Sequence, residues 1–239
     1  MKQSIEIDGV RIPFEEGQTI MDAALQARIY IPHLCHHPDF DPIGSCRLCV
    51  VKVNQRFVSS CTAQAEDGLV VDNKSAELMD KRRSLLKLLF IEGNHICPAC
   101  EKSGACTLQA VAYHCELLAP ELSHLNPKRL VDASHAAITI DYNRCIACGL
   151  CVKASAEKDK KSVFTLGGRG TKTQLMLNSS SGKLVDTNIS VNDVAIKVCP
   201  VGVFLSKHQA YETPIGQRLY DKVSIKQLFT KEKSSENKS

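Results

Sequence analysis

The arrangement of twelve cysteines along 239 residues limits the possible folds of this chain more than any other feature. Eleven of them, together with one histidine, form three groups with short spacing. Residues 1–8 lack the apolar core of a signal peptide, and the longest apolar stretch, residues 85–91, is far shorter than a membrane span. A cytoplasmic protein without a membrane partner is therefore expected. Thiols stay reduced in that compartment, so C-x2-C spacing indicates metal ligands before disulfides.

The first group consists of Cys35, Cys46, Cys49 and Cys61, in the spacing C-x10-C-x2-C-x11-C. Four thiolates, two of them in a short C-x2-C loop, suit a [2Fe–2S] cluster, although plant-type ferredoxins have a shorter first loop and a longer last interval. Gly44 would let backbone amides turn toward the sulfurs. The alternative is a structural zinc site with four cysteine ligands, which more usually shows two C-x2-C pairs.

The second group is His95-x-Cys97-x2-Cys100-x5-Cys106. Its three cysteines can bind three irons of a [4Fe–4S] cluster, and His95 can supply the fourth ligand. On spacing alone, a zinc site of three cysteines and one histidine is a competing interpretation. Cys115 belongs to none of the groups and is expected to be a half-buried free thiol.

The third group is Cys145-x2-Cys148-x2-Cys151, followed after 47 residues by Cys199-Pro200. This is the bacterial ferredoxin arrangement and the most specific pattern in the chain. In two-cluster ferredoxins the remote cysteine serves the other cluster. The sequence holds no second C-x2-C-x2-C trio, so Cys199 is expected to close the same [4Fe–4S] cluster.

Hydrophobic periodicity predicts a compact sheet with one helix packed on it for residues 1–74. Asp8-Gly9 is expected to form a hairpin turn, and Thr19 to be a helix N-cap. The expected elements are a hairpin over 4–12, a helix over 19–29 and strands over 50–53 and 69–71.

Residues 75–128 are expected to be mainly helical. A helix with Ser75 as its N-cap should reach Ile91 and stop at Gly93, and a second helix should cover 107–118. The buried stripe of the first helix is predicted to be Leu78, Leu85, Leu86, Leu89 and Phe90. A domain boundary is placed at the connection that contains Pro120 and Pro127.

Residues 129–230 are predicted to form a third domain, and the tail 231–239, which has no apolar residue, to be disordered. Ser190-x-x-Asp193 is a capping pattern that should open a short helix ending at Cys199-Pro200. The other expected elements are strands over 137–140, 162–166 and 173–177, with a cysteine loop after the first.

Composition excludes several kinds of function. The formal net charge is only +4, because 30 Lys and Arg are interleaved with 26 Asp and Glu, so no basic cluster for nucleic acid is expected. The sequence has neither a G-x-G-x-x-G fingerprint nor a Walker loop, and the glycine cluster at 167–170 is interpreted as a turn. We therefore expect no catalytic residue on this chain, and hydride chemistry only on partner subunits that carry flavin or a nickel–iron site.

The segment Glu92-Gly93-Asn94-His95-x-Cys97-Pro98-x-Cys100-Glu101-Lys102-Ser103-Gly104-x-Cys106-x-Leu108-Gln109 resembles the N-terminal part of the large iron–sulfur subunit of respiratory complex I and of iron-only hydrogenases. In those families one His and three Cys bind one [4Fe–4S] cluster, which implies that His95 is a ligand. With Cys199-Pro200-Val201-Gly202 and the segment 211–218, the chain more narrowly resembles the diaphorase iron–sulfur (gamma) subunit of soluble NAD-reducing [NiFe]-hydrogenases.

This resemblance implies an α+β fold with an N-terminal β-grasp [2Fe–2S] ferredoxin-like domain, a helical segment with the His-ligated cluster, and a C-terminal single-cluster ferredoxin-like domain. It also implies a subunit that relays single electrons between [NiFe]-hydrogenase subunits and a flavin/NAD-binding diaphorase subunit. Unlike this chain, complex I subunits and iron-only hydrogenases continue into a large C-terminal domain, and the latter carry eight Cys in the ferredoxin-like section.

Two alternatives remain open at the level of sequence. One is an electron-relay subunit of a complex I-like or formate-oxidising NAD-linked assembly, which would use the same clusters with another electron source. The other is a zinc-stapled interaction module without a redox function.

Overall fold

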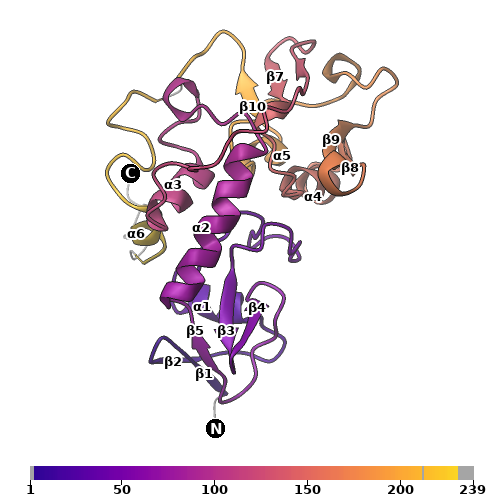
Figure 1. Cartoon of the computed structure of the whole chain (residues 1–239). Helices are drawn as coiled ribbons and strands as arrows, with labels where there is room; N and C mark the ends of the chain where they lie inside the picture. The colour runs from indigo at the N-terminus through magenta and orange to yellow at the C-terminus, as the bar shows by residue number, and fades with distance from the viewer. Residues whose placement is uncertain (1–2, 212, 231–239) are drawn as a thin grey trace, which may run out of the picture.

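The computed structural model describes residues 3–211 and 213–230, so the predicted disordered tail lies outside the described residues. A small sheet lies at one end of the molecule and the cysteine-rich C-terminal part lies at the other (Figure 1). Helix α2 (Ala76–Ile91) runs between these two ends. The α+β class predicted from the sequence is confirmed.

The N-terminal domain is a five-stranded sheet in the order β2-β1-β5-β3-β4. Strands β1 and β5 are parallel and every other neighbouring pair is antiparallel, which is the mixed sheet expected of a β-grasp domain. Its elements are β1 (Ser4–Ile7), β2 (Val10–Pro13), α1 (Ile20–Gln26), β3 (Val50–Val53), β4 (Arg56–Ser59) and β5 (Val70–Asp72).

Local sequence determines where helix α1 begins and how the chain turns between β3 and β4. Thr19 caps α1 as predicted, because its Oγ1 accepts from the Asp22 N–H at 3.1 Å while its own N–H donates to the Asp22 carboxylate at 3.0 Å. Strand β4 was not predicted. It follows a two-residue turn, Asn54 and Gln55, in which both residues have positive φ (47° and 66°). Hairpins of this kind usually carry glycine there, so the usual sequence cue is missing.

Helix α2 begins after Ser75, but not through the side-chain cap expected there. The carboxylate of Asp72 instead accepts from the Ser75 N–H at 2.9 Å. The buried residues of α2 are Leu78, Arg82, Leu86 and Ile91, whereas Leu85, Leu89 and Phe90 of the predicted stripe are only partly buried. The buried arginine was not predicted.

Helix α3 (Thr107–His114) and the C-terminal part complete the fold. A three-stranded sheet in the order β10-β7-β6 lies beside a separate β8-β9 hairpin. The elements are β6 (Val131–Asp132), β7 (Ile138–Asp141), α4 (Leu150–Glu157), β8 (Phe164–Gly167), β9 (Gln174–Leu177), α5 (Val194–Lys197), β10 (Phe204–Ser206) and α6 (Ile225–Thr230). Short 3-10 turns are η1 (Cys97–Ala99), η2 (Tyr142–Arg144), η3 (Gly170–Lys172) and η4 (Leu184–Asp186).

Two expectations for this part need correction. Helix α4, which buries Leu150, Cys151, Ala154 and Ser155, occupies part of what was expected to be a loop. The predicted pattern Ser190-x-x-Asp193 does precede α5, but the carboxylate of Asp193 accepts from the Ser190 N–H and from Lys161 Nζ and does not cap the helix. The first N–H groups of α5 donate instead to Asp159, which lies just after α4, at 2.8 and 3.0 Å.

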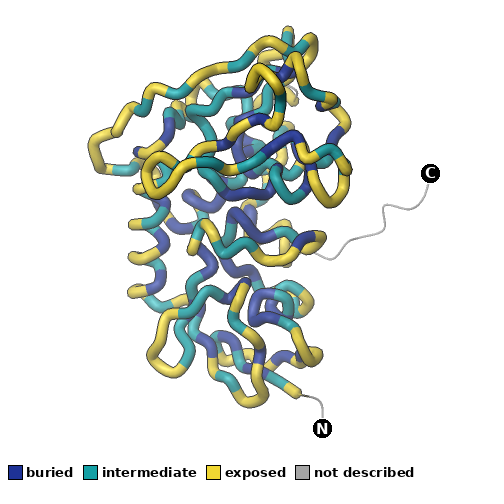
Figure 2. Tube along the Cα trace, turned by 90° about the vertical axis from the view of Figure 1, so that its right-hand side faces the viewer, coloured by how far each residue is buried: buried dark blue, intermediate teal, exposed yellow. Residues whose placement is uncertain are grey.

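The buried residues form two hydrophobic cores (Figure 2). The smaller core lies inside the N-terminal domain and includes Cys49 and Cys61. The larger core runs from Tyr30 to Ile225 and takes residues from all three parts of the chain. Most cysteines therefore lie in this one continuous core. The domain boundaries at 74/75 and 128/129 remain predictions.

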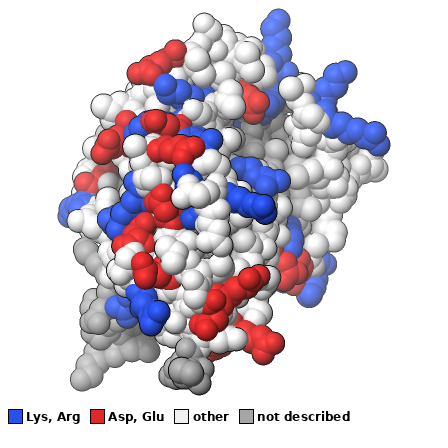
Figure 3. Space-filling view, turned by 60° about the horizontal axis from the view of Figure 1, so that its bottom comes forward, with Lys and Arg blue, Asp and Glu red and all other residues white. Residues whose placement is uncertain are grey.

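Two surface properties bear on function. Both signs of charge are intermingled on the face seen in Figure 3. Within the described residues, no helix is long and apolar enough to cross a membrane.

Candidate metal centres

The four cysteines of the first group lie together at the edge of the N-terminal domain. The backbone N–H of Cys46 donates to the sulfur of Cys35 at 3.3 Å, and the Sγ atoms of Cys49 and Cys61 are also 3.3 Å apart. The interaction of Cys49 with Cys61 lowers the pKa of Cys49 to about 7, and that of Cys46 with Cys35 lowers the pKa of Cys35 to about 6. The pKa of Cys61 is raised by Cys49, burial, Cys35 and Cys46, so all four sulfurs interact.

Left-handed backbone conformations shape the first loop. Gly44 has φ +68° and Arg47, inside the C-x2-C turn, has φ +58°. Such a conformation is uncommon at a non-glycine residue. Two residues after Gly44, the backbone N–H of Cys46 donates to the sulfur of Cys35, as expected for amides that turn toward the sulfurs.

The second group is arranged around η1 and the first turn of α3. Cys97 opens η1 and Cys106 is the N-cap of α3. Burial raises the pKa of Cys106 to about 12, with contributions from the charges of Cys100 and Cys97. The three cysteines predicted to act together are therefore close enough for their charges to interact.

The imidazole of His95 has a ring nitrogen that no hydrogen bond occupies in the part of the chain that the structure describes. Its Nε2 is buried and has no hydrogen-bond partner among the described residues. Burial lowers its pKa to about 4, so the ring is neutral at pH 7, the form that binds metals. A Cβ on Gly93 would lie 2.6 Å from Nε2, so only glycine fits there. His95 and Cys97 line the same cavity.

The third group surrounds a small apolar cavity. Cys145, Cys148, Cys151 and Cys199 all line it, with Val203 among its apolar walls. Burial raises the pKa of each thiol, that of Cys199 to about 11. Buried thiolates are costly unless a metal takes up their charge, so this donor set fits a thiolate-bound cluster. The 47-residue interval thus brings Cys199 back to the trio.

The third group lies between the other two. On one side the Ser45 hydroxyl donates to the carbonyl of Ala147 at 3.2 Å, which joins the first and third loops. On the other side the N–H of Thr107 donates to the carbonyl of Pro200 at 2.9 Å, which joins the second and third groups.

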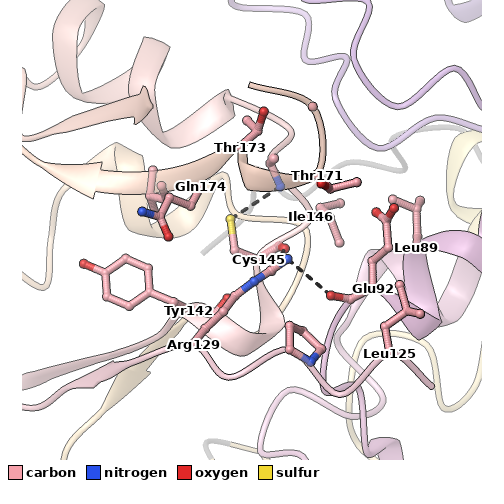
Figure 4. Close-up of a pocket in the computed structure, with 14 residues that line it drawn as sticks. Leu89, Glu92, Leu125, Arg129, Tyr142, Cys145, Ile146, Thr171, Thr173 and Gln174 are labelled. Atoms are coloured by element: carbon pink, nitrogen blue, oxygen red, sulfur yellow. Dashed lines mark hydrogen bonds between the residues drawn. The ribbon is translucent and has the colours of Figure 1, made fainter. Parts of the chain in front are cut away.

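Another cavity, of about 410 Å³, lies beside Cys145 (Figure 4). Arg129 spans its wall, with Nη1 donating to the Cys145 carbonyl at 3.1 Å and Nη2 to the Glu92 carbonyl at 3.2 Å. This arginine ties the end of α2 to the third cysteine loop.

The remaining cysteine, Cys115, is fully buried rather than half-buried as expected. Burial raises its pKa to about 11. It is the C-cap of α3, whereas Cys106 is the N-cap. Nine helical steps of 1.5 Å separate them by about 13 Å, so Cys115 lies at the far end of the helix from the second group.

Several arginines around these centres were missed from the sequence. Arg144 directly precedes Cys145, and its Nη1 lies 3.5 Å from the sulfur of Cys100. Arg218 Nη1 donates to the Ser103 carbonyl at 2.9 Å, inside the second loop. Position next to a cysteine was the only available cue for Arg144.

Among the described residues, no three His, Cys, Asp or Glu side chains converge on the position of a single metal ion.

Three family models match successive parts of the chain. Residues 2–76 match the 2Fe-2S iron-sulfur cluster binding domain, 82–118 the NADH-ubiquinone oxidoreductase-G iron-sulfur binding region, and 136–205 the ferredoxin-like domain of NADH-quinone oxidoreductase subunit 3. The fold and the cysteine sites thus define an iron–sulfur electron-transfer protein with one 2Fe-2S domain and further 4Fe-4S binding regions.

Similar proteins show to which family within this class the chain belongs. The chain is 37% identical over 227 residues to the gamma subunit of the NAD-reducing hydrogenase HoxS of Cupriavidus necator, covering 95% of this chain and 96% of that protein. A solved NAD+-reducing [NiFe]-hydrogenase in the H2-reduced state contains a chain with 46% identity and a TM-score of 0.91, at 95% and 96% coverage. The chain belongs to the family of gamma subunits of NAD-reducing hydrogenases, which confirms the predicted resemblance.

More distant relatives are much longer. The alpha subunit of the NADPH-Fe(3+) oxidoreductase of Geobacter sulfurreducens is 31% identical over 206 residues, and this chain covers 24% of it. The mitochondrial 78 kDa subunit of the NADH-ubiquinone oxidoreductase of Candida albicans is 28% identical over 213 residues, and this chain covers 29% of it.

Proposed function

We propose that this chain is the electron-relay subunit of an NAD-reducing [NiFe]-hydrogenase. It would carry single electrons between hydrogenase subunits and a flavin/NAD-binding diaphorase subunit, in the reaction H2 + NAD+ → NADH + H+. The observation that carries this function is the contact of three cysteine groups in one chain, with the third group between the others. The near-complete coverage of the hydrogenase gamma subunit supports the choice of assembly.

The metal ligands would be the residues expected from the sequence. Cys35, Cys46, Cys49 and Cys61 would hold one [2Fe–2S] cluster. His95, Cys97, Cys100 and Cys106 would hold one [4Fe–4S] cluster, and Cys145, Cys148, Cys151 and Cys199 would hold another. Clusters bound there would each accept and release one electron.

The protein supplies position and environment for this relay. The Ser45–Ala147 and Thr107–Pro200 hydrogen bonds fix the order first group, third group, second group. The side chains around the third group are mainly apolar. Electron flow is allowed in either direction along this order, and hydride chemistry would occur on the partner subunits, in the cytoplasm.

The alternative assemblies are distinguished by sequence identity and by partners. This chain is 37% identical to the hydrogenase gamma subunit but 31% and 28% identical to the two longer oxidoreductase subunits, which favours the hydrogenase. Anaerobic purification of the chain with its native partners, followed by mass spectrometry, tests this directly. Nickel–iron and flavin-binding subunits are expected. A formate-oxidising or quinone-reducing set of partners would contradict the proposal.

Function is tested in the same complex by interrupting the central group. Cys148→Ser should abolish hydrogen-driven NAD+ reduction while the diaphorase subunit still oxidises NADH with an artificial acceptor. Cys115→Ala, at the buried cysteine outside the groups, is the matched control and should leave hydrogen-driven reduction in place. Equal activity of Cys148→Ser and the native complex would rule out the relay.

A further inference from the structure

Arg144 connects the second and third cysteine groups through one side chain. Its backbone is the last residue of η2 and directly precedes Cys145 of the third group. Its Nη1 lies 3.5 Å from the sulfur of Cys100 in the second group, within reach of an N–H···S hydrogen bond. The side chain is only 16% exposed, so water screens this charge weakly.

Two carboxylates hold the guanidinium in this position. Nη1 lies 2.6 Å from the Glu101 carboxylate, and Nε lies 2.8 Å from the Asp141 carboxylate. Glu101 follows Cys100 in the chain, so a negative charge lies close to the same sulfur. Together the three side chains carry one net negative charge, and the positive member is the one in contact with the sulfur.

The space around this contact is closed. A Cβ on Gly202 would lie 3.4 Å from both Arg144 Nη1 and Cys100 Sγ, and 2.9 Å from the Cβ of Lys102. Glycine at this position therefore lets the segment after Cys199 pack against the guanidinium and the sulfur together.

We propose that Arg144 tunes the reduction potential of the second group, an inference that rests on the proposed electron-relay function. A cationic N–H donor at a ligand sulfur stabilises the extra negative charge of the reduced state, and so raises the potential. The negative charge of Glu101 lowers the potential, so the net effect on the second group depends on the ion pair between Glu101 and Arg144. Arg144 is a positioning residue, because it acts through Cys100.

Redox titration followed by EPR on the anaerobically assembled complex tests the proposal. Arg144→Gln should shift the reduction equilibrium of the second group at least tenfold toward the oxidised form. For one electron, this lowers the midpoint potential by about 59 mV. Glu101→Gln should shift the same potential in the opposite direction. The [2Fe–2S] signal of the first group should keep its potential in both variants.

Arg83→Gln is the matched control, because Arg83 also pairs with a carboxylate, Asp80, but lies on α2. It should leave all potentials unchanged. If Arg144→Gln fails to assemble the second cluster, Glu101→Gln decides, since a raised potential supports the proposal and an unchanged one overturns it. The proposal is also overturned if both variants show all three cluster signals at unchanged potentials. It is overturned as well if Arg144→Gln and Glu101→Gln shift the potential of the second group in the same direction. A native protein without cluster signals would instead refute the proposed function.

Discussion

The backbone N–H of Thr107 donates a 2.9 Å hydrogen bond to the carbonyl of Pro200. Each residue directly follows a cysteine, Cys106 of the second group and Cys199 of the third. One backbone hydrogen bond thus joins the second and third cysteine groups, although Cys106 and Cys199 are 93 residues apart in the chain. Electron transfer between centres depends on their separation.

Metal content separates the relay from a zinc-stapled module. Anaerobically prepared protein should be brown and should contain about ten iron atoms, two plus four plus four, with matching acid-labile sulfide. Metal and sulfide analysis measure this. A colourless preparation that holds mainly zinc after strictly anaerobic assembly would end the electron-carrier interpretation.

The isolated chain should bind neither NAD nor flavin and should show no hydrogenase or diaphorase activity. The reason is that the sequence offers no dinucleotide fingerprint. Equilibrium dialysis with FMN and NADH checks this prediction. Stoichiometric, tight binding of either molecule to the purified single chain would contradict it.

Substitution of His95 should alter only the second group. A neutral imidazole leaves a cluster with one less negative charge than a thiolate does, so His95→Cys should lower its reduction potential if a cubane forms. His95→Ala should leave one iron without a protein ligand and favour a three-iron form, while the Cys145 group stays intact. EPR-monitored titration distinguishes these results. Unchanged potentials in both variants would show that His95 is not a ligand.

Gly104 should be intolerant of a side chain because Arg218 packs against it. A Cβ there would lie 2.2 Å from Nε of Arg218, and φ is +78°. Gly68 is the matched control, since it has φ +79° but nothing within 4 Å of an added Cβ. Both alanine variants bear the strain of about 1–2 kcal/mol for a left-handed residue. Gly104→Ala should lose more, seen as a lower thermal midpoint and reduced iron content. Equal losses would show that the Arg218 contact is unimportant.

The buried Arg82 should be essential for stability. It is 1% exposed and donates to the carbonyls of Asn73 and Val50 at 2.8 and 2.7 Å. Arg82→Met would leave these acceptors buried and unpaired, at a cost of roughly 3 kcal/mol in the free energy of unfolding. Arg83→Met, one position along the same helix and partly exposed, should cost less than about 1 kcal/mol. Denaturant unfolding compares them, and similar losses would contradict this role.

Local patterns were sufficient to predict most elements and the grouping of the cysteines. Cys46 and Cys49, or Cys145 and Cys148, are close in sequence, so their spacing alone indicates a shared loop. The Thr19 cap was also predictable, because its partner Asp22 is three residues away.

Apart from the return of Cys199 to the Cys145 trio, features that depend on distant partners were not predictable. The cap of α5 comes from Asp159, 35 residues before Val194, and the sulfur contact of Arg144 spans 44 residues. Helix α4 was missed because it is only 8 residues long and its buried face contains small residues such as Ala154 and Ser155. Strand β10 exists only because β7 offers it an edge. Tertiary context decides these features.

The 47-residue interval before Cys199 also imposes an order on biosynthesis. A ribosome has completed all proposed ligands of the first group once 61 of the 239 residues are made, and those of the second group by residue 106. The third group lacks its last sulfur until residue 199 has been added, and β7 lacks its partner until β10 (Phe204–Ser206) has been added. A nascent chain released before residue 199 would carry the two outer centres of the relay without the one that joins them. The third group is therefore the last of the three for which translation supplies a complete set of ligands for iron and sulfide.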